Sequence, residues 1–277
     1  MTCPLCKAAE TRCLFVKDTA SFMRCSMCGF EFAKVTSNAN LQNSLEDYDE
    51  VYMQYIKDNV ADEKNFQSVL KWIGKHVDVT QMKVLDVGCG SGKFVRYLRG
   101  KSINATGIEP SQALYDSYLS GENIFQNKTV ESLSAEVSMR WTVITVLDVL
   151  EHVEDPNSFI MALRKVLADD GYIFIVTPDV GSITAKILGR HWHFFHKYHL
   201  SYFSKKTFSR FCEIYGFDVV SWRQMAVNFS VGYIIRYAFS LITRRSVASF
   251  ACKFDRLCLP LITFDRFSAC LCKKSDG

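Results

Sequence analysis

The sequence predicts an α/β fold, a doubly wound parallel sheet preceded by a small metal-stabilised N-terminal piece. From Met82 onward, strand-like and helix-like segments alternate, and a buried strand runs directly into a glycine-rich turn. Near the N-terminus, two pairs of cysteines have the spacing of metal-binding knuckles. We therefore expect three regions, which comprise residues 1–33, 34–76 and 77–277.

Length and composition are those of a folded protein with a large core. The chain has 277 residues, 48% of them hydrophobic, enough for one α/β domain and an appendage. The net charge of +4 is modest and is not gathered in one run, so nucleic acid is not an expected partner. The eleven cysteines are odd in number and follow no apolar signal segment, which indicates a reducing, cytoplasmic compartment.

The N-terminal piece has the cysteine spacing of a zinc ribbon. Cys3 and Cys6 form one C-x-x-C pair, and Cys25 and Cys28 form another, with eighteen residues between the pairs. Four thiolates complete a tetrahedral zinc site and leave no open position for catalysis. A redox pair would need a thioredoxin-like strand and helix, for which this segment has too few apolar residues. We expect residues 1–33 to bind a structural Zn²⁺.

Residues 34–76 are predicted to connect the ribbon to the main domain. The stretch 34–47 is polar, rich in Asn and Ser and without periodicity, which is typical of a linker. From Tyr48 to His76, apolar residues recur at spacings of three and four. This part is therefore expected to form helices that pack on the following domain.

The glycine-rich turn within residues 82–94 is the feature around which the main domain is organised. Glycines occupy every second position after the strand, at Gly88, Gly90 and Gly92. Such a turn needs backbone angles that other residues avoid, and it lets a ligand approach the main chain. The spacing G-x-G-x-G differs from the dinucleotide fingerprint G-x-G-x-x-G. With Asp86 two residues earlier, it resembles motif I of the class I S-adenosylmethionine (SAM) methyltransferases.

That resemblance covers residues 48–274 and implies a seven-stranded Rossmann-like methyltransferase sheet that binds SAM at the glycine turn. Glu109 ends the second strand, where a carboxylate can accept both ribose hydroxyls. Glu131 follows the third strand, where the family often places an acid near the adenine. Leu147 and Asp148 end the fourth strand and are expected to contact the cofactor.

The segment D-V-L-E-H-V that starts at Asp148 resembles the LEH methyltransferases, which are related to ubiquinone-biosynthesis enzymes. Three interpretations stay open. His152 could act as a general base, with a pKa suited to taking a proton near neutral pH. Alternatively, Asp148, Glu151 and His152 could hold Mg²⁺ or another divalent cation, as the comparable segment does in ubiquinone and small-RNA 2′-O-methyltransferases. In the third interpretation, Glu151 caps a helix and His152 packs in the core.

A run rich in histidine and aromatic residues extends over residues 191–204. His199, Leu200, Phe203 and Ser204 match the family element His-Leu-x-x-Phe-Ser. The resemblance implies that His199 is a catalytic base or a second metal-side ligand, and that the aromatic run forms a wall of the substrate pocket. Ser204 is the expected N-cap of a helix.

Residues 226–262 are expected to form an apolar helical insertion. Its first apolar stretch is interrupted by Arg236 and is short for a membrane span. Interfacial helices that touch the inner face of a membrane, and a lid or dimer face, both fit this pattern. The oligomeric state stays open.

The resemblance implies a SAM-dependent methyltransferase, and we expect O-methylation of a small molecule, a sugar, in polysaccharide or secondary-metabolite biosynthesis. Three alternatives stay open: C-methylation of a ketosugar, O-methylation of RNA or of a quinone or lipid, and SAM binding without turnover in a scaffold protein. Because the sulfonium of SAM is already activated, the protein has only to align the acceptor and take up its proton.

Overall fold

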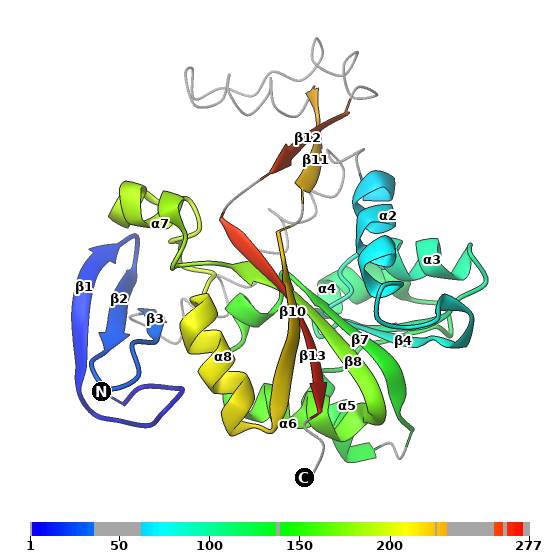
Figure 1. Ribbon diagram of the computed structural model, residues 1–277, viewed down its shortest axis with the longest axis horizontal. Coiled ribbons are helices and arrows are strands. Elements are labelled where there is room, and N and C mark those ends of the chain that lie inside the picture. The colour runs from blue at the N-terminus through cyan, green and yellow to red at the C-terminus, as the bar shows by residue number, and fades with distance from the viewer. Residues whose placement is uncertain are drawn as a thin grey trace.

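The structure is a computed structural model, in which helices cover both faces of a central sheet (Figure 1). The N-terminal strands stand at one side of this sheet, and a separate two-stranded sheet lies above it in the view. The structure describes residues 2–35, 62–136, 139–224, 226–231, 258–262 and 265–273.

The central sheet has seven strands in the order β10-β13-β8-β7-β4-β5-β6. The strands are β4 (Lys83–Val87), β5 (Asn104–Ile108), β6 (Phe125–Gln126), β7 (Trp141–Leu147), β8 (Leu167–Pro178), β10 (Phe217–Arg223) and β13 (Arg266–Lys273). Strands β4 to β8 pair in parallel, while β13 runs antiparallel to both β8 and β10. The predicted α/β class and seven-stranded sheet are confirmed.

The sheet is doubly wound because neighbouring residues of each central strand enter different cores. Val84 packs on the face covered by α2 and α3, and Leu85 packs on the face covered by α5, α6 and α8. A strand buried on both faces needs apolar residues at consecutive positions, which is the pattern in β4 and β7. The covering helices are α2 (Asp62–Ile73), α3 (Lys93–Arg99), α5 (Val130–Glu136), α6 (Pro156–Val166) and α8 (Lys205–Ile214).

Short helices fill the connections at the carboxyl ends of the parallel strands. They are α4 (Gln112–Leu114), η2 (Tyr115–Leu119), η3 (Leu150–His152), α7 (Ile183–Leu188) and η4 (Gly189–His191), and η1 (Val79–Gln81) precedes β4. The element η3 directly follows β7, so it carries the predicted LEH segment to the edge where open α/β sheets bind ligands.

The N-terminal ribbon, residues 2–35, is built into the rest of the protein. Its strands are β1 (Thr11–Lys17), β2 (Ala20–Cys25) and β3 (Glu31–Val35), and β9 (Ser201–Tyr202) pairs with β3 as a fourth strand. The ribbon residues Phe30 and Phe32 belong to the same hydrophobic core as Leu85 of the central sheet. The sequence predicts the ribbon but does not predict this attachment.

Two predicted segments lie wholly or partly outside the described residues. Residues 36–61, which contain the linker and the first predicted helices, are among them. Of the apolar insertion 226–262, the structure describes two antiparallel strands at its ends, β11 (Ala226–Ser230) and β12 (Cys258–Ile262). These ends are strands rather than the expected helix, and residues 232–257 lie outside the described part. Within the described residues, no helix has both the length and the apolar character needed to cross a bilayer.

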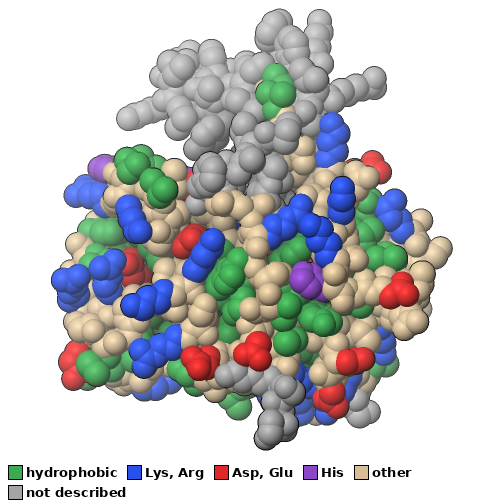
Figure 2. Space-filling model, in the orientation of Figure 1, with side chains coloured by type: hydrophobic (Ala, Val, Ile, Leu, Met, Phe, Trp, Pro, Cys, Tyr) green, Lys and Arg blue, Asp and Glu red, His purple; other side chains and the backbone are tan. Residues whose placement is uncertain are grey.

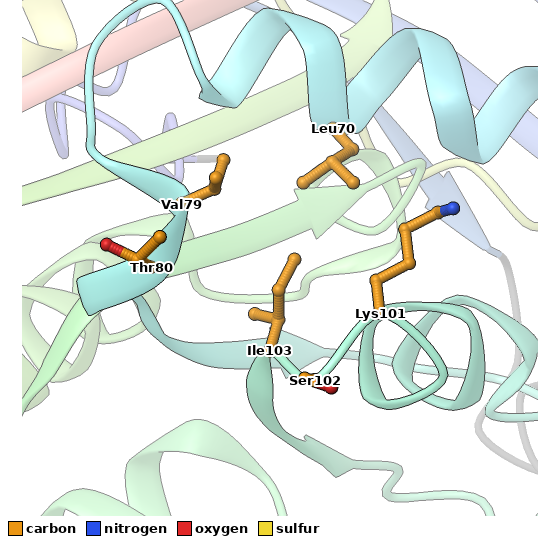
Figure 3. Close-up of a pocket in the computed structure, with 6 residues that line it drawn as sticks. All are labelled: Leu70, Val79, Thr80, Lys101, Ser102 and Ile103. Atoms are coloured by element: carbon orange, nitrogen blue, oxygen red, sulfur yellow. The ribbon is translucent and has the colours of Figure 1, made fainter.

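A cavity of about 380 Å³ opens at the end of the sheet opposite η3. Its lining comes from the C-terminal half of α2, from η1 and from the turn before β5 (Figure 3). The lining residues are Leu70, Val79, Thr80, Lys101, Ser102 and Ile103. Because η1 and that turn precede their strands, the cavity lies at the amino ends. Ligands of open α/β sheets bind at the carboxyl ends, so this cavity is not the candidate cofactor site.

Candidate functional site

The glycine turn joins β4 to α3 and has a conformation that only glycine tolerates well. Gly88, Gly90 and Gly92 have φ angles of +68°, +54° and +72°. A Cβ atom at Gly88 would lie 2.6 Å from a methyl group of Val149, and one at Gly92 would lie 2.5 Å from the ring of Phe125. Both the backbone angles and the lack of space therefore require glycine at these two positions.

Glu109 lies directly after β5 and its carboxylate reaches the glycine turn. The side chain is buried, with 6% exposure of the residue. Its Oε2 accepts the backbone N–H of Gly90 at 2.8 Å, and its Oε1 accepts the backbone N–H of Ser111 at 2.9 Å. The structure thus brings together the acid and the glycines that the sequence singles out. The two hydrogen bonds fix the orientation of the carboxylate.

The other predicted cofactor residues are distributed around this turn. Asp86 is buried within β4, and its Oδ1 accepts the hydroxyl of Thr145 at 2.6 Å. Burial, opposed by that hydrogen bond and reinforced by the charge of Glu109, raises the pKa of Asp86 to about 7. Glu131 lies in the first turn of α5, and Leu147 ends β7 partly buried. Asp86 therefore joins β4 to β7 beneath the turn.

Asp148 follows β7 in a strained conformation and is paired with an arginine that the sequence analysis missed. Its φ is +56°, in the left-handed region. Its Oδ2 accepts Arg266 Nη1 at 2.9 Å, and its Oδ1 is buried without a hydrogen-bond donor among the described residues. Arg266 begins β13. Because β13 runs antiparallel to β8, it starts at the edge of the sheet where the parallel strands end. That topology is the signal that could have found Arg266.

Glu151, His152 and His199 form a cluster at this edge. Their candidate ligand atoms all lie within 4.8 Å of one another. Glu151 and His199 are buried, with exposures of 2% and 5%, and the rings of His152 and His199 meet edge to face at 4.7 Å. The prediction joined Asp148 to Glu151 and His152. In the structure, His199 completes the group of three, while Asp148 pairs with Arg266.

Each member of this cluster is oriented by a hydrogen bond to a residue outside the cluster. Thr177 donates its hydroxyl to Glu151 Oε2 at 2.8 Å. The Nδ1 of His152 lies 2.9 Å from the carbonyl oxygen of Tyr198, and the Nδ1 of His199 lies 3.0 Å from that of Phe194. A carbonyl oxygen can only accept, so Nδ1 donates and the lone pair of each ring is on Nε2. Metal-binding histidines are commonly oriented in this way.

Burial shifts the pKa values of the cluster toward neutral side chains. Burial, reinforced by the charge of Asp148, raises the pKa of Glu151 to about 8. Burial lowers the pKa of His152 to about 4 and holds that of His199 well below its ordinary value. The near-neutral pKa expected for His152 is therefore wrong, because the ring is removed from water. Such a histidine is a weak base, but its neutral form is the one that binds metals.

The aromatic run before Ser204 has a different environment from the one predicted. Trp192, Phe195 and Tyr202 are buried in a cluster with Phe22 of the ribbon rather than forming a pocket wall. His196, in the same run, contacts the cluster of three: the centroid of its ring lies 3.8 Å from that of His199. The expected helix cap is present: the Oγ of Ser204 accepts the backbone N–H of Thr207 at 3.2 Å, at the start of α8.

The four ribbon cysteines come together as the spacing predicts. The sulfur atoms of Cys3 and Cys28 are 3.7 Å apart, those of Cys6 and Cys25 are 3.6 Å apart, and all four lie within 4.8 Å of one another. A tetrahedral zinc ion with Zn–S bonds of about 2.3 Å needs sulfur atoms about 3.8 Å apart. The distances therefore fit one zinc ion. Cys13 lies on β1, exposed and outside this group.

Comparison with known proteins identifies relatives of the main domain. A family model described as a methyltransferase domain matches residues 52–222. The ubiquinone biosynthesis O-methyltransferases of Azotobacter vinelandii (strain DJ / ATCC BAA-1303) and Pseudomonas fluorescens (strain Pf0-1) are each 35% identical to this chain over 114 residues. The match covers 39% of this chain and 49% of theirs. The chain thus spans about half the length of the curated relatives it matches.

Solved structures share the fold. A SAM-dependent methyltransferase from Archaeoglobus fulgidus superimposes with a TM-score of 0.55 at 14% identity, over 80% of this chain and 99% of that one. The 1,6-didemethyltoxoflavin-N1-methyltransferase of Burkholderia thailandensis, solved with its substrate and S-adenosylhomocysteine, superimposes with a TM-score of 0.53 at 12% identity. That match covers 96% of this chain and all of the other. At these identities the similarity concerns the fold alone.

Proposed function

The chain belongs to the methyltransferase-domain family, and we propose that it transfers the methyl group of SAM to a hydroxyl oxygen of a small-molecule acceptor. The observation that carries this proposal is the cluster of buried Glu151, partly buried His152 and buried His199, which lies at the same edge of the sheet as the glycine turn. O-methylation requires that the acceptor hydroxyl lose its proton, and this cluster has the donor set of a divalent-cation site.

SAM is assigned to the turn that holds Gly88, Gly90 and Gly92. Glycine gives the turn its left-handed backbone angles, and the turn follows β4 at the edge where open α/β sheets bind ligands. Glu109 is the proposed ribose acceptor, because its carboxylate is held against the turn by Gly90 and Ser111. Leu147, which ends β7 beside β4, and Asp148, which follows it, are the proposed further cofactor contacts. Glu131 is the proposed adenine-side acid.

The cluster of three has the ligand atoms of a divalent-cation site. Its carboxylate suits Mg²⁺ or Mn²⁺, while its two imidazoles favour a transition metal such as Mn²⁺ over Mg²⁺, which prefers oxygen ligands. Asp148 lies outside this group of three, although its charge acts on Glu151, and its buried Oδ1 has no hydrogen-bond donor among the described residues. The charge of Asp148 raises the pKa of the buried Glu151 carboxyl, and a cation would relieve the cost of a second negative charge there. When bound there, the cation would lower the pKa of a coordinated acceptor hydroxyl.

The acceptor is proposed to carry a hydroxyl beside a second oxygen, since such a pair chelates a divalent cation. The names of the curated relatives favour an aromatic hydroxyl of quinone biosynthesis, while the sequence-based expectation is a sugar. Both acceptor types have vicinal oxygens. C-methylation of a ketosugar is less supported, because it needs a strong base and the pKa values of His152 and His199 are lowered by burial.

RNA methylation remains an alternative because small-RNA methyltransferases share the Glu-His segment. On the face drawn in Figure 2, Lys and Arg side chains are interspersed with Asp and Glu rather than gathered into a stripe. A backbone-tracking RNA site uses a continuous basic surface. The described surface on this face therefore favours a small acceptor over RNA.

A structural Zn²⁺ held by the four ribbon cysteines is part of the same proposal. The donor set is four thiolates at distances suited to one ion. Burial raises the pKa of the Cys25 thiol, but hydrogen bonds from the main-chain amides of Cys28 and Met27 lower it. The pKa of this thiol is therefore lowered to about 7. The site is closed, so we assign it no catalytic step.

The proposal is tested by isothermal titration with SAM, followed by a screen of catechol and sugar acceptors with labelled SAM. We expect SAM to bind without added metal. Turnover on one acceptor class should need Mg²⁺ or Mn²⁺ and stop on addition of EDTA, after a brief exposure that leaves the ribbon zinc in place. No SAM binding at millimolar concentration would refute the enzyme proposal in favour of a scaffold. Turnover that is insensitive to EDTA would refute the proposal that a divalent cation is needed for catalysis.

A further inference from the structure

The N-terminal ribbon and the segment that carries His199 share one sheet. We call residues 192–200 the histidine loop. The backbone N–H of Ala33 donates to the carbonyl oxygen of Leu200 at 3.0 Å, and β3 then pairs with β9 immediately after the loop. In Figure 1 the ribbon strands stand beside α7, which precedes the loop in the chain. The C-terminal end of the histidine loop is therefore tied to the ribbon.

A second attachment holds the middle of the loop. The ammonium group of Lys17, at the end of β1, donates to the carbonyl oxygen of Phe195 at 2.6 Å. The ring of Phe22 lies 5.2 Å from that of Phe195 and 5.7 Å from that of Tyr202, and all three rings are buried. The hydrogen bond sets the position of the backbone, and the aromatic packing excludes water from it.

From the loop, these contacts continue to the candidate cation ligands. The N–H of Leu200, whose carbonyl oxygen is bound to the ribbon, donates to the carbonyl oxygen of Glu151 at 2.7 Å. The carbonyl oxygen of Phe194, next to the one that Lys17 binds, accepts His199 Nδ1 and the hydroxyl of Tyr202. One short stretch of backbone thus links the ribbon to two members of the cluster.

The cysteine end of the ribbon is attached at a separate place. Asn157, in the first turn of α6, donates its side-chain N–H to the carbonyl oxygen of Pro4 at 2.7 Å. Cys3 and Cys25 are buried in the core that includes α6. The ribbon is therefore fixed to the domain at its cysteine end and to the histidine loop at its hairpin end.

We propose that the zinc-bound ribbon is a positioning element for the active site, which holds the histidine loop so that His199 meets Glu151 and His152. This inference rests on the proposed function, since it assigns His199 to the cation. Lys17 is the positioning residue, acting on His199 through the backbone of Phe194 and Phe195. Loss of this contact lets the loop move away from the cluster, while the glycine turn and Glu109, on the other side of β7, keep their geometry.

The first test measures cation and cofactor affinity in the full-length, zinc-loaded protein. Mn²⁺ binding is followed by electron paramagnetic resonance and SAM binding by calorimetry. Lys17→Met keeps the apolar stem and removes the ammonium group, and Lys34→Met, an exposed lysine on β3, is the matched control. We expect Lys17→Met to weaken Mn²⁺ binding about tenfold, within the range known for outer-shell partners of metal ligands, with SAM affinity unchanged. Unchanged Mn²⁺ affinity would overturn the inference, and so would an equal loss of both affinities.

The second test is independent of the cation. Amide hydrogen exchange over residues 194–203 is measured by mass spectrometry in the wild type, in Lys17→Met and in zinc-free Cys25→Ser. We expect about tenfold faster exchange in this segment for both variants, with the strands β4, β5 and β7 unchanged. If the wild type fails to bind Mn²⁺, the cation part of the proposed function is refuted, and exchange alone decides the positioning function. Exchange in Lys17→Met equal to that of the wild type overturns it.

Discussion

Replacing Glu109 by glutamine tests the cofactor site most directly. The carboxylate accepts two main-chain N–H groups, from Gly90 at 2.8 Å and from Ser111 at 2.9 Å. A glutamine amide presents one oxygen and one NH₂ group, so one of the two N–H donors would face another donor. Leaving a buried donor unsatisfied costs about 1–3 kcal/mol. The free energy of unfolding should fall by about that amount.

The same substitution should also weaken SAM binding. Charge-assisted hydrogen bonds to the two ribose hydroxyls contribute about 1.5–3 kcal/mol, which corresponds to a loss of about 10- to 150-fold in affinity. Calorimetric titration with SAM measures the affinity, and urea denaturation measures the stability. Glu131→Gln, at the other predicted acid, is the matched control and should change SAM affinity less than fivefold. A folded Glu109→Gln protein that binds SAM within twofold of the wild type would refute the assignment of Glu109 to the ribose.

Three further predictions concern the metals and the acceptor side. Metal analysis should find about one zinc per chain, lost in Cys25→Ser; a folded, zinc-free wild type would contradict this. His199→Ala should slow turnover about 10- to 100-fold and leave SAM affinity within twofold, so an equal loss of SAM affinity in His199→Ala and Glu109→Ala would remove the division of functions. The pKa of Glu151 is raised to about 8 without a cation, so below that pH its carboxyl must lose a proton before it can bind a metal. Mn²⁺ affinity should therefore rise about tenfold per pH unit from pH 6 to 8 and then level off. The imidazoles, with lowered pKa values, are neutral throughout this range and add no slope, so a flat pH profile would show that Glu151 is not a ligand.

The features that the sequence predicts well are local. The C-x-x-C pairs, the glycine turn and the cap at Ser204 each depend on residues within a few positions of one another, and their geometry follows from spacing. Glu109 is predictable although it lies about twenty residues after the glycine turn, because the carboxyl end of the neighbouring parallel strand places it beside that turn. The assignment to the methyltransferase family is confirmed by the family model, and the predicted fold is confirmed by the solved structures. The functions of the individual site residues stay predictions.

Other expectations depend on surroundings that residue type does not encode. The sequence predicts a near-neutral pKa for His152, but that pKa depends on how much water the fold excludes from the ring. The sequence predicts a substrate-pocket wall from the aromatic run, but aromatic residues are equally suited to a core. Trp192 and Phe195 are buried against the ribbon, more than 150 residues earlier in the chain.

The sequence by itself determined the fold class, the glycine turn and the cysteine cluster, because short-range patterns of glycine, cysteine and apolar residues restrict the backbone directly. Only the tertiary structure decided which side chains meet above that turn. Arg266 reaches Asp148 across 118 residues because β13 enters the sheet antiparallel beside β8. His199 joins Glu151 and His152 because β9 extends the ribbon sheet. Such contacts follow from the order and direction of strands, which no local spacing encodes.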